Sequence, residues 1–190
     1  MTKLIVLATA AFFVTACRAP SAPAPIAPAS STNAAPAGAC ARTTIVLVRH
    51  GEKASSDPDT ELSAAGHERA KRIAIVLGNA GVTRLVATDV RRTQQTLAPL
   101  SEKIGKPVEV RAARDTDALI RELAASPAGS VVVVAHHSNG IPRITRSFGV
   151  EPRGITPTDD ALPEKDFSRI VVLTLDCDRK HATSIELSSD

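Results

Sequence analysis

The chain has 190 residues, of which 43% are hydrophobic and 23% are charged, a balance typical of a soluble globular domain and not of a chain disordered throughout. Aromatic residues make up only 2%, with no Tyr and no Trp, which argues against a stacking surface for single-stranded nucleic acid. The net charge of +3 is too small to indicate a nucleic-acid partner, and three Cys residues are too few for a zinc cage or a disulfide scaffold.

The first residues have the layout of a secretory signal peptide, which we predict over residues 1–16. Lys3 supplies a positive charge, residues 4–14 are apolar, and small residues follow. The apolar run is shorter than the roughly 20 residues that span a membrane. The run closes on VTAC, which resembles a bacterial lipobox and predicts lipidation at Cys17. An ordinary signal peptide with an incidental Cys is the alternative.

Residues 17–40 are rich in Ala, Pro and Ser and contain little that could build a core. Because Pro fixes φ and removes a backbone donor, we predict a disordered tether that is partly extended as polyproline. The folded domain is expected over residues 41–190, a common size for one domain. Together these segments predict an exported lipoprotein that is anchored by its lipid at the periplasmic face of a bacterial membrane.

Strand and helix patterns alternate through the predicted domain. Apolar, β-branched runs predict buried strands, and helix formers with apolar residues on one face predict helices. The expected strands are 43–48, 85–87, 107–110, 131–134, 170–175 and 183–187, and the expected helices are 63–79, 90–104, 115–125 and 139–148. Four alternations followed by two strands in succession predict an α/β three-layer sandwich with a mostly parallel central sheet and an antiparallel edge.

Residues with phosphate chemistry follow the predicted strands. In open α/β sheets the ligand-binding groups gather at the carboxyl ends of the strands. Arg49 and His50 follow the first strand, Arg92 opens the helix after the second, and a His-His pair follows the fourth. An Arg side chain binds phosphate oxygens in a bidentate manner, and imidazole is a nucleophile at neutral pH. This combination predicts phosphoryl transfer through a histidine.

Four ordered motifs make the prediction more specific. They are IVLVRHGE at residues 45–52, Leu62-Ser63 with Gly66 and Ala70, TDVRRTQQT at 88–96 and VAHHSNGIP at 134–142. In this order they resemble the motifs of the histidine phosphatase superfamily, the phosphoglycerate mutase-like fold, in its short branch without a lid.

The resemblance implies a role for each site residue. His50 is the expected nucleophile, with its other ring nitrogen oriented by a backbone carbonyl. Arg49, Arg92 and His137 are expected to hold the phosphoryl oxygens and to stabilise their charge in the transition state. Because these cations are side chains, no metal and no other cofactor are expected.

Two positions leave alternatives open. Alignment on Ser138-Asn139 and Pro142 selects His137 as the second pocket histidine, whereas alignment on the commoner V-S-H-G-G form selects His136. The insertion that carries a general-acid Glu in larger members is absent between Arg92 and His137. Asp115 and Asp117 are the best substitutes, and either of them could equally be a helix N-cap.

The resemblance also bears on the cysteines. In the family the late strand lies beside the first strand and runs antiparallel to it, which brings Cys40 close to Cys177. Strand spacing is compatible with a disulfide, and exported proteins retain such bonds. We therefore expect a Cys40–Cys177 bridge, with two unrelated thiols as the alternative.

These observations predict a metal-independent phosphatase that acts on phosphomonoesters through a phosphohistidine in the cell envelope. The expected partner is a small phosphomonoester or a phosphorylated envelope component, together with the membrane through the lipid anchor. Two alternatives are a non-catalytic phosphate-binding or scaffold lipoprotein on the same fold, and a mutase of the same family. No Walker motif, G-x-S-x-G or C-x5-R motif supports a different phosphate chemistry or hydrolase.

Overall fold

The computed structural model describes residues 40–156 and 158–190. The predicted signal peptide, the predicted lipidation site Cys17 and the predicted tether as far as residue 39 lie outside the described residues. Within the described residues, no helix has the length and apolar character needed to cross a membrane.

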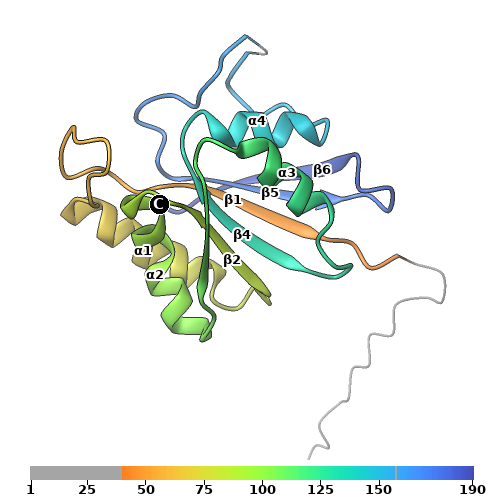
Figure 1. Ribbon diagram of the computed structural model, residues 1–190, viewed down its shortest axis with the longest axis horizontal. Coiled ribbons are helices and arrows are strands. Elements are labelled where there is room, and N and C mark those ends of the chain that lie inside the picture. The colour runs from red at the N-terminus through yellow and green to blue at the C-terminus, as the bar shows by residue number, and fades with distance from the viewer. Residues whose placement is uncertain (1–39, 157) are drawn as a thin grey trace, which may run out of the picture. The chain divides into compact units, whose positions relative to one another are not determined.

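A six-stranded sheet forms the centre of the domain, with the strand order β3-β2-β4-β1-β5-β6 (Figure 1). Strands β1 to β4 pair in parallel, whereas β5 runs antiparallel to β1 and β6 runs antiparallel to β5. The bounds are Thr44–Arg49 for β1, Arg84–Thr88 for β2, Val108–Arg111 for β3, Val131–His136 for β4, Arg169–Leu175 for β5 and Ala182–Ser188 for β6. The predicted fold class, a mostly parallel α/β sheet with an antiparallel edge, is confirmed.

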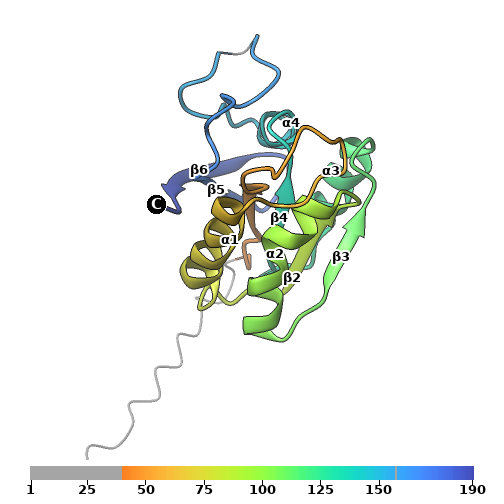
Figure 2. The same cartoon turned by 90° about the vertical axis from the view of Figure 1, so that its left-hand side faces the viewer.

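Helices cover both faces of the sheet and complete the three layers (Figures 1 and 2). Helices α1 and α2 lie against each other on one face, and α3 and α4 lie on the other. Their bounds are Ala64–Leu77 for α1, Arg91–Ile104 for α2, Thr116–Ala124 for α3 and Gly140–Ser147 for α4. Each helix lies within the range that the sequence predicts, and no end differs by more than two residues.

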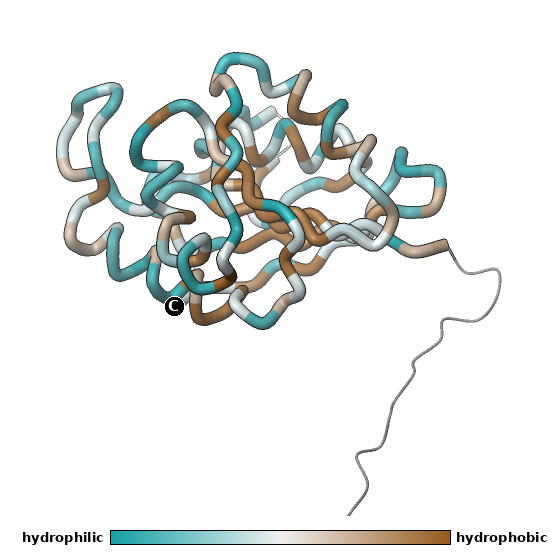
Figure 3. The backbone as a smooth tube through the Cα atoms, turned by 60° about the horizontal axis from the view of Figure 1, so that its bottom comes forward, coloured by the Kyte–Doolittle hydropathy of each residue, from teal (hydrophilic) through white to brown (hydrophobic). Residues whose placement is uncertain are grey.

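The central strand β1 shows how the core is built. Its side chains alternate between the two faces of the sheet, as the two-residue period of a strand requires. Ile45 and Leu47 pack with α3 and α4, while Val46 and Val48 pack with α1 and α2. Because both faces are covered, the strand is apolar along its length, and Figure 3 shows such hydrophobic segments running through the interior of the domain.

Two glycines bring the loop after β1 close to helix α1. A Cβ atom on Gly66 would lie 2.4 Å from the carbonyl oxygen of Glu52, and one on Gly51 would lie 2.8 Å from the carbonyl oxygen of Gly66. The Ser63 side chain caps α1 by accepting a hydrogen bond from the Gly66 amide at 3.2 Å. The loop that carries His50 is therefore held against the start of α1 by backbone contact.

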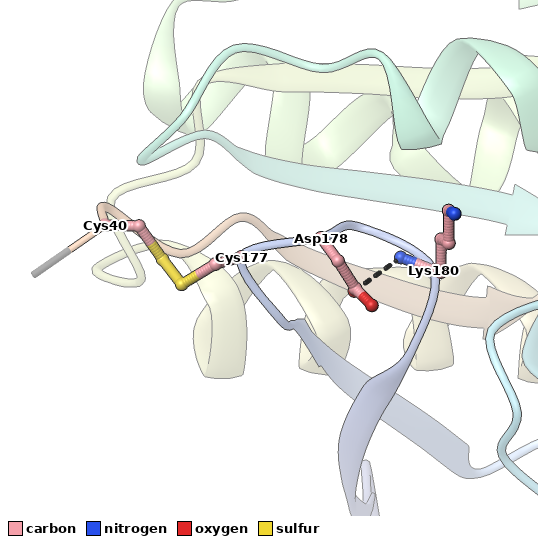
Figure 4. The surroundings of a disulfide bond; sticks show 4 residues. All are labelled: Cys40, Cys177, Asp178 and Lys180. Atoms are coloured by element: carbon pink, nitrogen blue, oxygen red, sulfur yellow. Dashed lines mark hydrogen bonds between the residues drawn. A yellow bond between two sulfur atoms is a disulfide. The ribbon is translucent and has the colours of Figure 1, made fainter.

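The opposite end of β1 carries a disulfide. Cys40 precedes β1, Cys177 follows β5, and the two are joined with their Cα atoms 6.0 Å apart (Figure 4). The adjacent turn is held by the Lys180 amide, which donates to the Asp178 side chain at 2.9 Å. The pairing that the resemblance led us to expect is present, because β5 lies antiparallel beside β1.

Candidate active site

A cavity of about 690 Å³ opens at the carboxyl ends of the parallel strands. Its walls come from the loops after β1, β3 and β4 and from the start of α2, which is the edge where ligand sites of such sheets form. The lining residues are Arg49, His50, Lys53, Val90, Arg92, Ala113, Arg114, His137, Ser138 and Asn139. All four residues that the resemblance implies for catalysis therefore meet in one cavity.

His50 is buried, with 4% of its surface exposed, and both its backbone and its ring are fixed. Its amide donates to the carbonyl oxygen of His136 at 3.0 Å, and its ring Nδ1 lies 2.8 Å from the carbonyl oxygen of Gly51. Because a carbonyl only accepts, Nδ1 carries the proton and Nε2 keeps a free lone pair. The carbonyl contact expected for the nucleophile is present.

The surroundings of His50 favour its neutral form. Burial is the main cause that lowers the pKa of His50 to about 4; the contact to the Gly51 carbonyl opposes this shift, and the neighbouring cations Arg92, Arg49 and Lys53 add to it. At neutral pH the ring is therefore neutral and Nε2 is unprotonated, as a nucleophile must be.

The Arg49 side chain is positioned by hydrogen bonds to the segment that leads into β5. Its Nη1 donates to the carbonyl oxygens of Pro163 and Glu164 at 2.9 Å each and to that of Asp166 at 3.3 Å. The ring of Phe167 lies 4.1 Å from the guanidinium carbon. Nε of Arg49 is buried without a hydrogen-bond partner, so an N–H donor remains available on a side chain that lines the cavity.

Arg92 and His137 contact each other in the wall of the cavity. Nη1 of Arg92 donates to the carbonyl oxygen of Pro58 at 2.7 Å, and Nη2 lies 3.3 Å from Nδ1 of His137. Nε2 of His137 lies 3.1 Å from the hydroxyl of Thr88, and its ring centroid lies 5.4 Å from that of His50. Like Arg49, Arg92 keeps a buried Nε without a partner.

The structure separates the two histidines that the sequence left open. His137 lines the cavity, while His136 is only 2% exposed and is absent from the lining. Nδ1 of His136 accepts a hydrogen bond from the His137 amide at 2.9 Å, and a Cβ atom on Gly140 would lie 1.9 Å from that nitrogen. His136 thus fills the space behind the loop and leaves His137 to face His50.

The positions of Asp115 and Asp117 do not support a role as general acid. Asp115 caps α3 by accepting a hydrogen bond from the Ala118 amide at 3.0 Å, and Asp117 forms an exposed ion pair with Arg143 at 2.6 Å. Neither residue lines the cavity. The N-cap reading applies to Asp115, because the first turn of α3 leaves amide donors that a carboxylate satisfies.

Three residues at the site were not assigned by sequence reasoning. Lys53, which follows the first motif directly, lies in the lining, whereas its neighbour Glu52 pairs with Arg69. Arg114 also lines the cavity, and its position after the third strand was the signal that could have found it. Phe167 had no signal, since only the tertiary fold brings it to Arg49.

The lining of the cavity is positively charged. Its lining contains Arg49, Arg92, Lys53 and Arg114 and no carboxylate. Among residues 40–156 and 158–190, no group of three or more His, Cys, Asp and Glu side chains is placed to hold a metal ion. The side chains present can bind an anion and stabilise negative charge that develops beside His50.

Comparison with known families agrees with this geometry. The model of the histidine phosphatase superfamily (branch 1) matches residues 45–115, which include His50 and Arg92. The probable phosphoglycerate mutase GpmB of Enterobacter sp. (strain 638) is 32% identical over 68 residues, which are 32% of this chain and 32% of that protein. The matched part thus spans about a third of that relative.

Solved structures match a larger part of the chain. The protein histidine phosphatase SixA complexed with tungstate has a TM-score of 0.61 at 22% identity, over 77% of this chain and 97% of that one. A mycobacterial glucosyl-3-phosphoglycerate phosphatase has a TM-score of 0.60 at 20% identity, over 76% and 97%. A structure named as the putative phosphohistidine phosphatase SixA from Nakamurella multipartitia has 26% identity and a TM-score of 0.53, over 77% of this chain and 95% of that one. The fold is that of the histidine phosphatases, and the family model and these relatives support this superfamily.

Proposed function

We propose that this chain is a phosphatase that hydrolyses phosphomonoesters through a phosphohistidine at His50. The observation that carries the proposal is the contact of His50 Nδ1 with the Gly51 carbonyl, which leaves Nε2 unprotonated in a cationic cavity. The superfamily that the family model supports, and neighbouring structures named as phosphatases, agree with this reading.

The first step forms a bond between His50 Nε2 and phosphorus while the bond from phosphorus to the ester oxygen breaks. The electron pair of that bond leaves with the alcohol or phenol oxygen. Arg49 and Arg92, each with a free buried Nε–H, are positioned to stabilise the charge on the phosphoryl oxygens, and His137 stands opposite His50. In the second step a water oxygen bonds to phosphorus while the bond from phosphorus to Nε2 breaks, and the electron pair of that bond restores the neutral ring. Inorganic phosphate is released, and the proton that water gives up balances the one that the departed oxygen takes from solvent.

The leaving group matters in this cavity. The lining defined by the described residues contains no carboxylic acid that could protonate a departing alkoxide. Esters whose leaving oxygen is already a weak base, such as aryl phosphates, should therefore react fastest. This makes an aryl phosphate the appropriate first substrate.

The direct test is hydrolysis of p-nitrophenyl phosphate by the full chain in detergent, in the presence of a chelator. We expect activity, a loss of at least about 10³-fold in His50→Ala because the nucleophile is removed, and no change in the control His67→Ala. His67 is an exposed histidine on α1. Brief incubation with ³²P-labelled substrate should label the wild type through an acid-labile bond. Full activity in His50→Ala, or dependence on added metal, would contradict the proposal.

The cellular location is a separate part of the proposal. The predicted signal peptide and the lipobox-like VTAC favour an exported lipoprotein anchored at Cys17. The Cys40–Cys177 disulfide is also consistent with an oxidising compartment. Metabolic labelling with a fatty acid tests the anchor: the wild type should be labelled and membrane-bound, whereas Cys17→Ala should lose the label. A wild-type protein without label would contradict it.

A further inference from the structure

Two buried threonines connect the end of β2 with the first turn of α2 and reach the ring of His137. Thr88 is the last residue of β2, and Thr93 lies in the first turn of α2. Both are buried, at 1% and 0% exposed. The Thr88 hydroxyl oxygen lies 2.8 Å from that of Thr93 and 3.1 Å from Nε2 of His137. The bond-making steps proposed above use neither hydroxyl.

The hydrogen bonds of the His137 ring have only one consistent direction. A guanidinium donates and does not accept, so the 3.3 Å contact with Nη2 of Arg92 makes Nδ1 of His137 an acceptor. Burial is the main cause that lowers the pKa of His137 to about 3, so the ring is neutral at pH 7 and carries one proton. That proton lies on Nε2, and Nε2–H therefore donates to the Thr88 hydroxyl oxygen.

The Thr93 hydroxyl completes this chain of hydrogen bonds. The proton of Thr93 is directed to the carbonyl oxygens of Val90 at 2.7 Å and Thr88 at 3.1 Å. Thr93 thus has an acceptor for its own proton, and its oxygen is free to accept the proton of the Thr88 hydroxyl. A carbonyl only accepts, so the chain ends there. In the reverse direction, Nδ1–H of His137 would face an N–H donor of Arg92.

We infer that Thr88 is a positioning residue which, with Thr93 behind it, fixes His137 in the Nε2–H tautomer and keeps Nδ1 turned to Arg92. The inference rests on the proposed phosphatase function of the same cavity. Thr88 acts through the ring of His137 and takes part in no bond making.

The fixed ring in turn orients the Arg92 guanidinium. Nη2 of Arg92 donates to Nδ1 of His137, and Nη1 donates to the carbonyl oxygen of Pro58, while the Nε–H remains without a partner. If the His137 ring turned or changed its tautomer, Arg92 would lose one of these two contacts. The orientation of a group that stabilises phosphoryl charge would then be less well defined.

Kinetics of Thr88→Val test the inference, because Val has a similar shape and lacks the hydroxyl. With p-nitrophenyl phosphate and the full chain in detergent, kcat should fall about tenfold, the effect of one hydrogen bond, and Thr88→Ser should retain most of the wild-type kcat. In a His137→Ala background, Thr88→Val should change kcat by less than about twofold, because the residue through which Thr88 acts is gone.

A matched control and an inner variant accompany this test. Thr43→Val removes another buried hydroxyl, which donates to the Pro127 carbonyl at the amino end of β1, and should leave kcat unchanged. Thr93→Val removes the acceptor of the Thr88 proton without touching His137. It should lower kcat by about threefold, again only when His137 is present, and it serves as the test if Thr88→Val does not fold.

The tautomer has a readout that does not depend on activity. In the ¹⁵N-histidine-labelled full chain at pH 7, the His137 ring should show a protonated Nε2 and an unprotonated Nδ1, with His137→Ala identifying its signals. Thr88→Val should replace this pattern by a mixture of the two tautomers, and Thr93→Val should do so to a smaller extent.

The outcomes separate the inference from the phosphatase. Equal losses of kcat with and without His137, or a wild-type tautomer pattern in both threonine variants, would overturn the positioning role while wild-type hydrolysis upholds the phosphatase. Absence of hydrolysis by the wild type would overturn the phosphatase itself, and the nitrogen spectra would still decide the tautomer.

Discussion

The two ends of strand β1 differ in how completely their buried polar groups are hydrogen-bonded. At the carboxyl end, the buried side-chain nitrogens of Arg49, Arg92 and His136 have no hydrogen-bond partner, and they are the only such side-chain atoms in the part of the chain that the structure describes. At the amino end, the Leu175 amide donates to the Thr43 carbonyl at 2.9 Å, and the disulfide closes the strand pair. The carboxyl end therefore has buried donors without a partner, whereas at the amino end the backbone groups are paired.

We interpret the unpaired donors at the carboxyl end as a loss of stability that serves function. A buried donor without a partner costs about 1–3 kcal/mol, and such groups persist where a ligand completes them. The covalent link at the other end restrains the unfolded chain and offsets part of that cost. We therefore expect perturbations at the carboxyl end to change turnover and pH response, and perturbations at the amino end to change stability alone.

The pH dependence of stability should show the largest effect. Burial lowers the pKa values of His50 and His136 to about 4 and that of His137 to about 3, from an ordinary value near 6.5. The unfolded chain takes up these protons first, so the stability that the neutral rings contribute is present above pH 6.5 and is lost as the pH falls toward 4. Each ring changes the free energy of unfolding by up to about 1.4 kcal/mol per pH unit in that window.

Urea unfolding at pH 7, 6 and 5 measures this slope. His136→Asn should flatten this slope, because one of the three histidine rings with a lowered pKa is gone. Removal of the disulfide should lower the free energy of unfolding by the same amount at each pH and leave the slope unchanged, since neither cysteine titrates when paired. A slope that is unaffected by His136→Asn would contradict the assignment of the pH response to the site end.

The two adjacent histidines give the next largest effect. His137→Ala should lower kcat/KM by about 10²–10³-fold, the usual result of removing a group that meets developing charge. His136→Ala should lower turnover much less and lower the free energy of unfolding instead, because that ring is buried behind the loop. Kinetics and urea unfolding measured on both variants test this prediction. A larger loss of kcat/KM in His136→Ala than in His137→Ala would assign the pocket role to His136.

These positions also show what the sequence could predict. The strands were predicted because runs such as residues 131–134 are apolar and β-branched, and the cavity was located because functional groups followed strand ends. Asp115 was a misleading candidate, since a carboxylate after a strand serves equally as an N-cap. The support of Arg49 by residues 163–167 was not predictable, because it depends on a contact across 114 or more positions of the chain.

The disulfide end should respond in stability alone. Replacing Cys40 and Cys177 together by Ser should lower the free energy of unfolding by about 2–4 kcal/mol, because the bridge closes a long loop with a sequence separation of 137. Turnover of p-nitrophenyl phosphate should stay within about twofold, since the bridge lies at the far end of β1 from His50. Mass spectrometry of the non-reduced protein is the control, and two alkylatable thiols at Cys40 and Cys177 would contradict the bridge.

The smallest effect concerns Phe167, which we regard as a positioning residue for Arg49. Its ring lies 4.1 Å from the guanidinium carbon and 6.1 Å from the His50 ring centroid, so it limits the directions that the guanidinium can take. A cation–π contact of this kind contributes about 0.5–2 kcal/mol, equivalent to roughly 2- to 30-fold in rate. In the proposed mechanism Arg49 stabilises charge mainly in the transition state, so Phe167→Ala should lower kcat by about that factor and leave KM nearly constant.

Two further variants separate positioning from packing. Phe167→Tyr keeps an aromatic face and should restore most of kcat, whereas Phe167→Leu keeps apolar bulk without the face and should resemble Phe167→Ala. A loss of packing alone would instead make Leu the better replacement and would lower the urea midpoint in step with kcat. Restoration of kcat by Leu would therefore show that the ring only fills space, and the carbonyl oxygens of Pro163, Glu164 and Asp166 would then suffice to orient Arg49.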